Sequence, residues 1–222
     1  MIIGIIIAMP EEMAPYKKHI EEIDTHYGRE FHKGNIGDNK IVICLSGIGK
    51  VNAAFATTIL VEKYKPELII STGVSGGLGQ KKPMDIVVAQ NIVQHDVDTS
   101  PLGDPKGMVS TIKKIYFETS KSHTQKIYDS LENASLGTMA CGDQFVAGKE
   151  KSQEIVNTFG AIACDMESGA IAQVAYITNT EFVVIRGISD SADELASMVF
   201  SELILKISLI TYNAVKKVIE KL

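Results

Sequence analysis

Three carboxylates stand where an apolar stretch of this chain gives way to a polar turn. Glu12, Glu167 and Asp190 each follow the end of such a stretch. Two carboxylic acids held in different protonation states can perform general acid–base catalysis, since one donates a proton while the other accepts one. We therefore treat these three residues as candidates for chemistry and ask whether the fold can bring them together.

Each acid also has a purely structural explanation. Carboxylates in the first turn of a helix stabilise it through the free N–H groups and the helix dipole. Glu12 follows Pro10, which suits a first helical position, and Glu167 opens the apolar helical stretch 164–177. Asp190 could cap a turn or a helix. The recurrence of acids at three comparable positions favours a shared site over three separate caps.

Apolar runs alternate with helical stretches along the chain, which predicts one α/β domain over residues 1–222 with a parallel or mixed sheet. Strands are expected at 2–8, 40–46, 66–73, 84–93, 135–142, 161–165 and 182–188. Helices are expected from Pro10 and over 47–64, 149–160 and 198–221, with Gly160 as a C-cap. Ligands of open α/β sheets bind beyond the carboxyl ends of the strands, so acids at three such ends should converge.

Composition excludes several classes of protein. The 222 residues are 45% hydrophobic and 22% charged with a net charge of −5, and the basic residues are not clustered as a nucleic-acid interface requires. The apolar N-terminal run is too short to cross a membrane. Cys44, Cys141 and Cys164 form no close pair, which predicts buried, reduced thiols in a cytoplasmic protein.

Three other motifs are candidate ligand sites. The glycine-rich stretch 73–79 is expected to be a turn, and it matches neither a dinucleotide fingerprint nor a P-loop. His95, Asp96 and Asp98 resemble a metal-ligand cluster, but strand alternation would put His95 on the face opposite the two acids, so no metal site is predicted. Phe145 is explained either as a core residue or as a ring that stacks on a flat base.

Six motifs together resemble one known family along nearly the whole chain. They are "IGIIIAMPEEM", "SGIGKVNAA", "TGVSGGL", "GDQFV", "DMESGAIA" and "RGISDSAD". In this order and spacing they are similar to the 5′-methylthioadenosine/S-adenosylhomocysteine nucleosidases of the purine nucleoside phosphorylase superfamily. The stretch "VQHDVDTSPLGDPKG" also resembles members that accept 6-amino-6-deoxyfutalosine.

The resemblance implies a single-domain, three-layer α/β fold with a twisted central mixed sheet flanked by helices. It implies hydrolysis of the N-glycosidic bond of adenine nucleosides in methionine salvage, with no cofactor and no metal. It also implies a homodimer in which a loop of the partner subunit helps to close the pocket around the 5′-substituent. Neither a nucleic acid nor a membrane is expected as a partner.

The resemblance also assigns roles to residues. Glu12 corresponds to the acid that activates water, Asp190 to the acid that protonates adenine N7, and Glu167 to the ligand of the ribose hydroxyls. The remaining substrate-binding residues that it implies are Met9, Ile48, Gly76, Phe145, Val146, Met166, Arg186, Ser189 and Phe200. The chain departs from the family pattern at Asp165, at Val74-Ser75 and at Gly187.

Loss of a base from a nucleoside builds positive charge on the ribose. One acid must protonate the departing base while another prepares water on the opposite face, as in glycoside hydrolysis. Asp190 must therefore hold a proton near neutral pH, which burial would favour, and Glu12 must be ionised, which Arg186 would favour. Two alternatives stay open: a phosphorylase, which the scarcity of arginine disfavours, and a non-catalytic nucleoside-binding protein.

Overall fold

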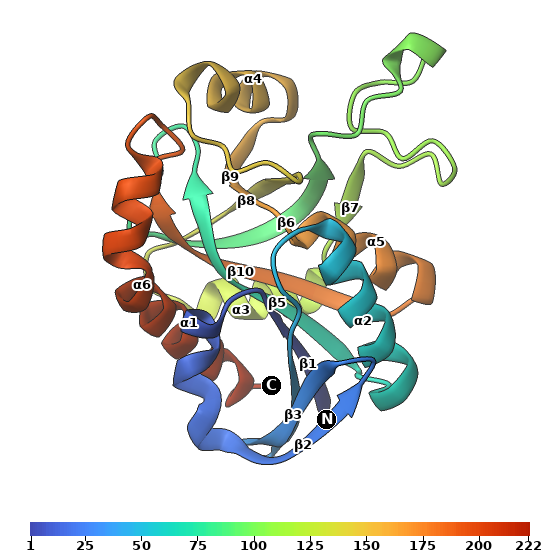
Figure 1. Ribbon diagram of the computed structural model, residues 1–222, viewed down its shortest axis with the longest axis vertical. Coiled ribbons are helices and arrows are strands. Elements are labelled where there is room, and N and C mark those ends of the chain that lie inside the picture. Colours follow the sequence, from blue (N-terminus) through green and yellow to red (C-terminus); the bar gives the residue numbers. More distant parts are fainter.

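A ten-stranded mixed sheet runs through the computed structural model, which describes residues 1–222 (Figure 1). Its spatial order is β10-β6-β8-β9-β5-β1-β4-β3-β2, with β7 added beside β6. The strands are β1 (Ile2–Ile7), β2 (Ile20–His26), β3 (Arg29–Ile36), β4 (Asn39–Leu45), β5 (Leu68–Gly77), β6 (Ile86–Gln94), β7 (Tyr116–Glu118), β8 (Ala134–Cys141), β9 (Ala161–Asp165) and β10 (Glu181–Asp190). The mixed sheet expected from the sequence is confirmed.

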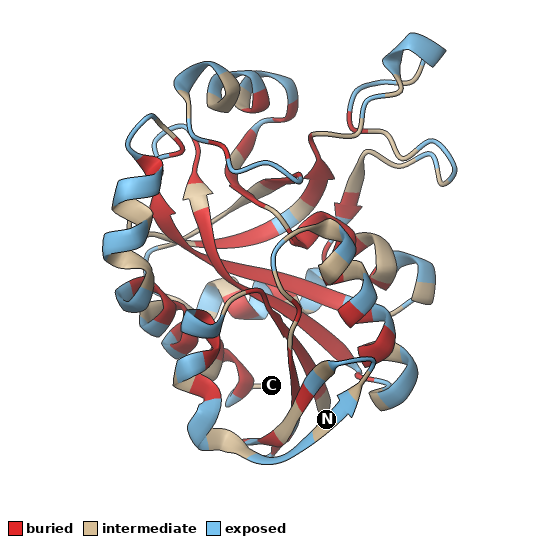
Figure 2. Ribbon diagram, viewed as in Figure 1, coloured by how far each residue is buried: buried red, intermediate tan, exposed pale blue.

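Helices cover both faces of this sheet, which gives the three layers that the resemblance implies (Figure 2). The helices are α1 (Pro10–Met13), α2 (Lys50–Tyr64), α3 (Lys121–Ser130), α4 (Lys149–Phe159), α5 (Ser168–Thr178) and α6 (Ala196–Ile219), with 3₁₀ turns η1 (Ala14–His19) and η2 (Ser100–Leu102). Side chains alternate along β1: Ile6 packs in the core under α2 and α5, whereas Ile5 and Ile7 pack in the core under η1 and α6. The all-apolar sequence of β1 follows from this burial on both faces.

Four neighbouring strands end at one edge of the sheet. Strands β1, β4, β5 and β10 are connected by parallel pairings, so their carboxyl ends point the same way. Strand β10 also pairs with β6, and β9 pairs with both β8 and β5, so this half of the sheet closes on itself. The segments that follow β1, β4, β8, β9 and β10 are gathered around one opening, together with the last residues of β5.

The glycine-rich stretch is not the turn that the sequence predicted. Strand β5 continues to Gly77, because β10 pairs along it as far as Gly76 and β9 pairs at Gly76 and Gly77. A Cβ atom at Gly73, whose φ is +144°, would collide with the side chains of Glu12 and Arg186. Glycine is thus needed here because charged side chains from two other segments lie against the strand.

The alternation argument for His95, Asp96 and Asp98 is also wrong. Strand β6 ends at Gln94, and the chain then turns, with Val97 N–H donating to the Gln94 carbonyl over 3.3 Å. Asp98 Oδ1 accepts from the Ser100 N–H over 2.9 Å at the start of η2. These residues belong to a turn, so the period of two that the argument assumed does not apply to them.

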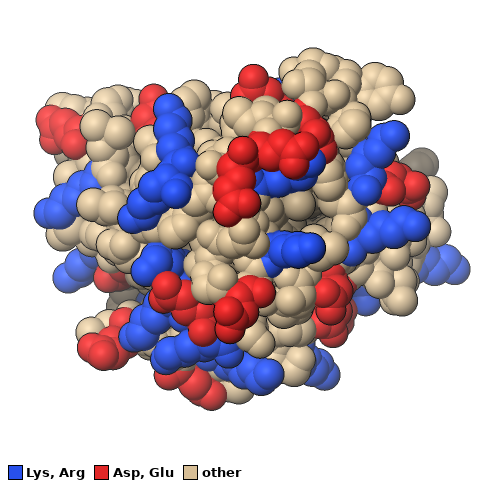
Figure 3. Space-filling view, turned by 90° about the horizontal axis from the view of Figure 1, so that it is seen from below, with Lys and Arg blue, Asp and Glu red and all other residues tan.

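The sequence reading missed the hairpin of β2 and β3, together with α3 and β7. The hairpin lies at the lower end of the molecule in Figure 1, where β2 pairs only with β3. Figure 3 shows the molecule from below, and acidic and basic side chains are interspersed on that face. These elements were missed because their apolar residues are sparse and their sequence resembles a polar loop.

The C-terminal helix packs against the strands that carry the site. A Cβ atom at Gly187 on β10 would collide with Thr211 Oγ1 and Ile207 Cγ2 of α6, so the departure at this position permits close helix–strand packing. By length and composition alone α6 could cross a membrane, with a mean hydropathy of 1.4 and 33% of that window buried. A core helix meets the same criterion, so this is weak support for a membrane span.

Candidate active site

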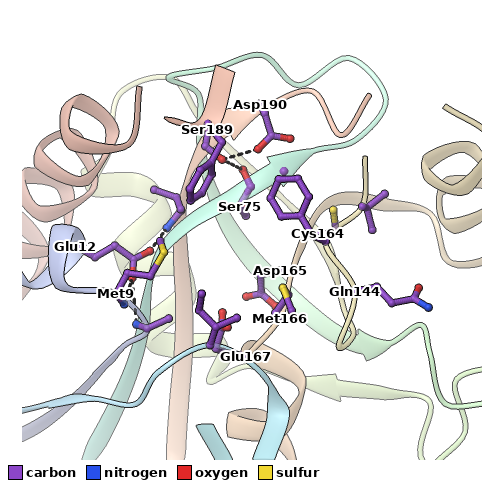
Figure 4. Close-up of a pocket in the computed structure, with 17 residues that line it drawn as sticks. Met9, Glu12, Ser75, Gln144, Cys164, Asp165, Met166, Glu167, Ser189 and Asp190 are labelled. Carbon is purple, nitrogen blue, oxygen red and sulfur yellow. Dashed lines mark hydrogen bonds between the residues drawn. The ribbon is translucent and has the colours of Figure 1, made fainter. Parts of the chain in front are cut away.

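A pocket with a cavity volume of about 200 Å³ opens at the edge where the strands end (Figure 4). All of the site residues predicted from the sequence except Arg186 line it: Met9, Glu12, Ile48, Gly76, Phe145, Val146, Met166, Glu167, Ser189, Asp190 and Phe200. The three acids come from α1, from the β9–α5 junction and from the end of β10, so the fold brings them to one place.

Glu12 is fixed by backbone donors and is only 4% exposed. Its Oε2 accepts from the N–H groups of Ala8 and Met9 over 3.1 and 3.0 Å, and its Oε1 accepts from the Val74 N–H over 2.8 Å. Burial raises the pKa of Glu12, although Arg186 and these donors oppose the rise. A carboxylate has about four acceptor positions, so three bonds leave one for a water molecule.

Asp190 ends β10 and is 2% exposed. Its Oδ1 accepts from the Ala192 N–H over 2.9 Å, and Ser189 Oγ lies 2.7 Å from its Oδ2. Burial raises the pKa of Asp190, in the direction that a proton donor at neutral pH requires. Ser189 Oγ also lies 3.1 Å from the Ser75 carbonyl, so the single hydroxyl proton can be directed to either acceptor.

Glu167 stands at the N-cap position of α5 and shares a buried cation with Asp165. Arg186 is 1% exposed; its Nε donates to Asp165 Oδ2 over 2.9 Å, and its Nη2 lies 3.8 Å from Glu167 Oε2. Burial raises the pKa of Glu167 to about 7, and Asp165 adds to this while Arg186 opposes it. The capping of α5 falls to Asp165, whose Oδ1 accepts from the Ser168 N–H over 3.2 Å.

Two aromatic rings, those of Phe145 and Phe200, also line the pocket. Phe145 is 49% exposed, which excludes the alternative that it is a core residue. Its ring and that of Phe200 meet edge to face with centroids 6.0 Å apart. An exposed ring on a loop beside carboxylates suits a flat, polar-edged ligand such as a base.

Comparison with known proteins identifies the family. The phosphorylase superfamily matches residues 2–219. The chain belongs to the phosphorylase superfamily. Within it, the chain is 39% identical over 211 residues to 5′-methylthioadenosine/S-adenosylhomocysteine nucleosidase of Oceanobacillus iheyensis, a match that covers 91% of each protein. It is 35% identical to the nucleosidase of the same description from Staphylococcus aureus strain MRSA252, over the full length of both.

Solved structures of this superfamily agree with the fold. The nucleosidase of Streptococcus pneumoniae, bound to the transition-state inhibitor MT-ImmA, superimposes with a TM-score of 0.95 at 34% identity and covers 99% of each chain. The futalosine hydrolase of Helicobacter pylori gives a TM-score of 0.94 at 33% identity, covering 100% of this chain and 98% of that one. Both similarities extend over the whole α/β fold rather than over a part of it.

Sequence reasoning missed several contributors to the site. Ser75, Gln144 and Cys164 line the pocket, and Asp165 pairs with the one arginine of the site motifs. The pairing could have been predicted from the sequence. Asp165 directly precedes Met166-Glu167 on an apolar strand, and a carboxylate on a buried strand needs a counter-ion. Arg186 itself lies beneath the pocket and does not line it.

The raised pKa of Glu167 predicts that stability depends on pH. The folded protein holds the proton of Glu167 up to about pH 7, against 4.5 for an unperturbed group. This contribution is complete below pH 4.5 and is lost as the pH rises through 7. The free energy of unfolding, measured with urea, should therefore be lower at pH 8 than at pH 5. We expect the titration of Glu167 to contribute on the order of 2 kcal/mol to this difference.

Glu167→Gln removes this titration and should flatten the pH dependence of stability. Glu202→Gln on the exposed side of α6 is the matched control and should leave it unchanged. An identical pH dependence in wild type and Glu167→Gln would contradict the prediction.

Proposed function

We propose that this protein hydrolyses the N-glycosidic bond of 5′-methylthioadenosine, S-adenosylhomocysteine and related adenine nucleosides, releasing adenine and the free 5-substituted ribose in methionine salvage. 5′-Deoxyadenosine and 6-amino-6-deoxyfutalosine belong to the same proposed substrate class. The observation that carries the proposal is the convergence of Glu12, Glu167 and Asp190 on one pocket. The similarity to nucleosidases over the full chain supports it.

Asp190 is the proposed general acid. Protonation of adenine at N7 neutralises the charge that the leaving base would otherwise carry, and a buried carboxyl with a raised pKa retains a proton for this step. Phe145 would stack on the base, and the backbone of Val146 would hydrogen-bond to its edge. Gly76 allows close approach of β5, because a Cβ atom there would lie 3.3 Å from Asp190 Oδ1.

Glu12 is the proposed base. Its remaining acceptor position can hold a water molecule, and the raised pKa makes the carboxylate a better proton acceptor near neutral pH. Arg186 lies beside it and limits that rise. Glu167 and Met166 would hold the ribose, with the Glu167 carboxylate placing negative charge next to the developing cation. Met9, Ile48 and Phe200 would contact the 5′-substituent.

Water is favoured over phosphate as the nucleophile. A phosphate ion carries nearly two negative charges and needs free cationic donors. The pocket wall instead presents Glu12 and Glu167, and the guanidinium beneath it is already paired with Asp165 over 2.7 Å. An anionic nucleophile would therefore be repelled where a neutral water is not.

The proposal predicts adenine release that does not depend on phosphate. The purified protein is incubated with 5′-methylthioadenosine, S-adenosylhomocysteine and 6-amino-6-deoxyfutalosine in parallel, in buffer without phosphate, and the free base is measured. We expect turnover in phosphate-free buffer and the free reducing sugar as the second product. Formation of ribose 1-phosphates would indicate a phosphorylase, and intact bound nucleoside would indicate a binding protein.

Replacing either proposed proton-transfer residue should stop turnover. Asp190→Asn cannot protonate the base and Glu12→Gln cannot take the proton of water, so each should lower kcat by about 10²-fold or more. Adenine binding should persist in Asp190→Asn, measured by calorimetry. A kcat close to that of wild type in Asp190→Asn would remove this residue as the acid.

We also infer a homodimer. Ile48, which lines the pocket, and Val51 and Phe55 on the following helix α2 are exposed in the single chain, and Leu102 in η2 is 85% exposed. Exposed apolar surface of this kind marks an interface. Sedimentation equilibrium should give twice the mass of 24.1 kDa. A monomer at micromolar concentration with full activity would overturn the inference.

A cytoplasmic location is proposed as well. The three cysteines are all free and buried, as is usual in a reducing compartment. Burial raises the pKa values of the Cys164 and Cys44 thiols above the usual range of a cysteine, which keeps both residues in the unreactive thiol form. Recovery of the protein outside the cytoplasmic fraction of its cell would contradict this proposal.

A further inference from the structure

A cluster of charged side chains, two of them partly buried, lies beside the pocket, and the proposed reaction does not use it. The cluster consists of Lys50 at the start of α2, Asp96 in the turn after β6, and Asp143 in the loop after β8. Three segments that are far apart in the sequence meet there. None of the three residues lines the pocket.

The central contact is an ion pair shielded from solvent. Lys50 Nζ lies 2.7 Å from Asp96 Oδ1 and 3.2 Å from Gln94 Oε1, and the side chains of Lys50 and Asp96 are 18% and 17% exposed. Burial alone would raise the pKa of Asp96, but hydrogen bonds from Lys50 and from the Asp143 N–H hold it below its usual range. A pair shielded in this way is worth more than a surface salt bridge.

The cluster holds the loop that carries Phe145 and Val146. Asp96 Oδ2 accepts from the Asp143 N–H over 2.9 Å, and Asp143 Oδ1 accepts from the Lys50 N–H over 2.7 Å. Both ends of Lys50, its ammonium and its backbone, are therefore connected to Asp143, one through Asp96 and one directly. Phe145 follows two residues later on the same loop.

The cluster also fixes the other half of the pocket. The Gly49 N–H, next to Lys50, donates to Glu167 Oε1 over 2.9 Å. Gln94, which accepts from Lys50, donates through Nε2 to Gln173 Oε1 on α5 over 2.7 Å. The start of α2 is thus tied both to the base side of the pocket, through Asp143, and to the ribose side, through Glu167 and α5.

We propose that Lys50 is a positioning residue that, through Asp96 and Asp143, sets the distance between the base-stacking loop and the carboxylate that holds the ribose. This inference rests on the proposed nucleosidase function. Lys50 touches neither the base nor the sugar in this arrangement, so it acts on binding through other residues. Base and ribose contacts are made in the ground state as well as in the transition state, so their loss should appear mainly in KM.

The test is a double-mutant cycle on the full-length protein. Lys50→Met removes the ammonium but keeps the unbranched stem, and Asp96→Asn removes the charge but keeps the shape. We expect each variant to raise KM for 5′-methylthioadenosine and Kd for adenine about ten-fold, with a much smaller change in kcat. The double variant should have KM and Kd values no higher than those of the more impaired single variant, because both changes break the same contact.

Two further variants separate positioning from general stability. Lys50→Arg keeps the charge and should recover most of the affinity for adenine. Lys33→Met is the matched control, because Lys33 also bridges two carboxylates, at 2.7 Å from Glu22 and 3.0 Å from Asp24, but does so on the β2–β3 hairpin. It should leave KM and Kd unchanged even where the melting temperature falls.

The outcomes distinguish this inference from the proposed function. An active wild type whose KM and adenine Kd are unchanged by Lys50→Met, or additive effects in the double variant, would overturn the positioning role. The positioning role would also be overturned if Lys50→Met lowered only kcat, and lowered it in proportion to the fraction of protein that had unfolded. A wild type that binds adenine but releases none from any nucleoside would overturn the reaction, while weaker adenine binding in Lys50→Met would still support the positioning role.

Discussion

One buried cation makes the arrangement of acids possible. Arg186 is fully buried, pairs with Asp165, and lies next to both Glu167 and Glu12. Burying several carboxylates together without a cation would be very unfavourable, because each would lose its hydration without compensation. One positive charge among three acids stabilises only part of their negative charge. Burial raises the pKa values of both Glu12 and Glu167, and the charge of Asp165 adds to the rise at Glu167, so proton uptake relieves part of the remaining charge.

The closed part of the sheet places this cation and its acids. Arg186 is reached by Asp165 because β9 is joined to β10 through β5 on one side and through β8 and β6 on the other. Glycine on β5 leaves room for the charged side chains that cross it from α1 and β10. The pocket is therefore not a depression added to the fold. It is the place where the end of β5 meets the ends of five other strands and the segments that follow them.

Much of this could be predicted from the sequence. The runs around Glu12, Glu167 and Asp190 are strongly apolar and end in Gly, Pro or acidic residues, so both the strands and their ends were recognisable. The stretch after Thr72 was misread as a turn, because composition cannot show that β9 and β10 pair along it. Strand alternation was wrongly applied to His95 and Asp96 for a related reason: the chain turns after Gln94, where Gln94 and Asp96 contact Lys50, more than forty residues away in the chain. The roles of the pocket residues came from the resemblance to the family.

The closure of the sheet leaves few backbone groups available to another molecule. Only β2 and the three-residue strand β7 have a partner on one side alone. On β2 the exposed side chains include Glu21 and Glu22, and the neighbouring strand adds Lys33. Charges along an open strand oppose the addition of a further strand from a second molecule. The charges on β2, the longer of the two edge strands, therefore oppose aggregation of this protein through strand pairing.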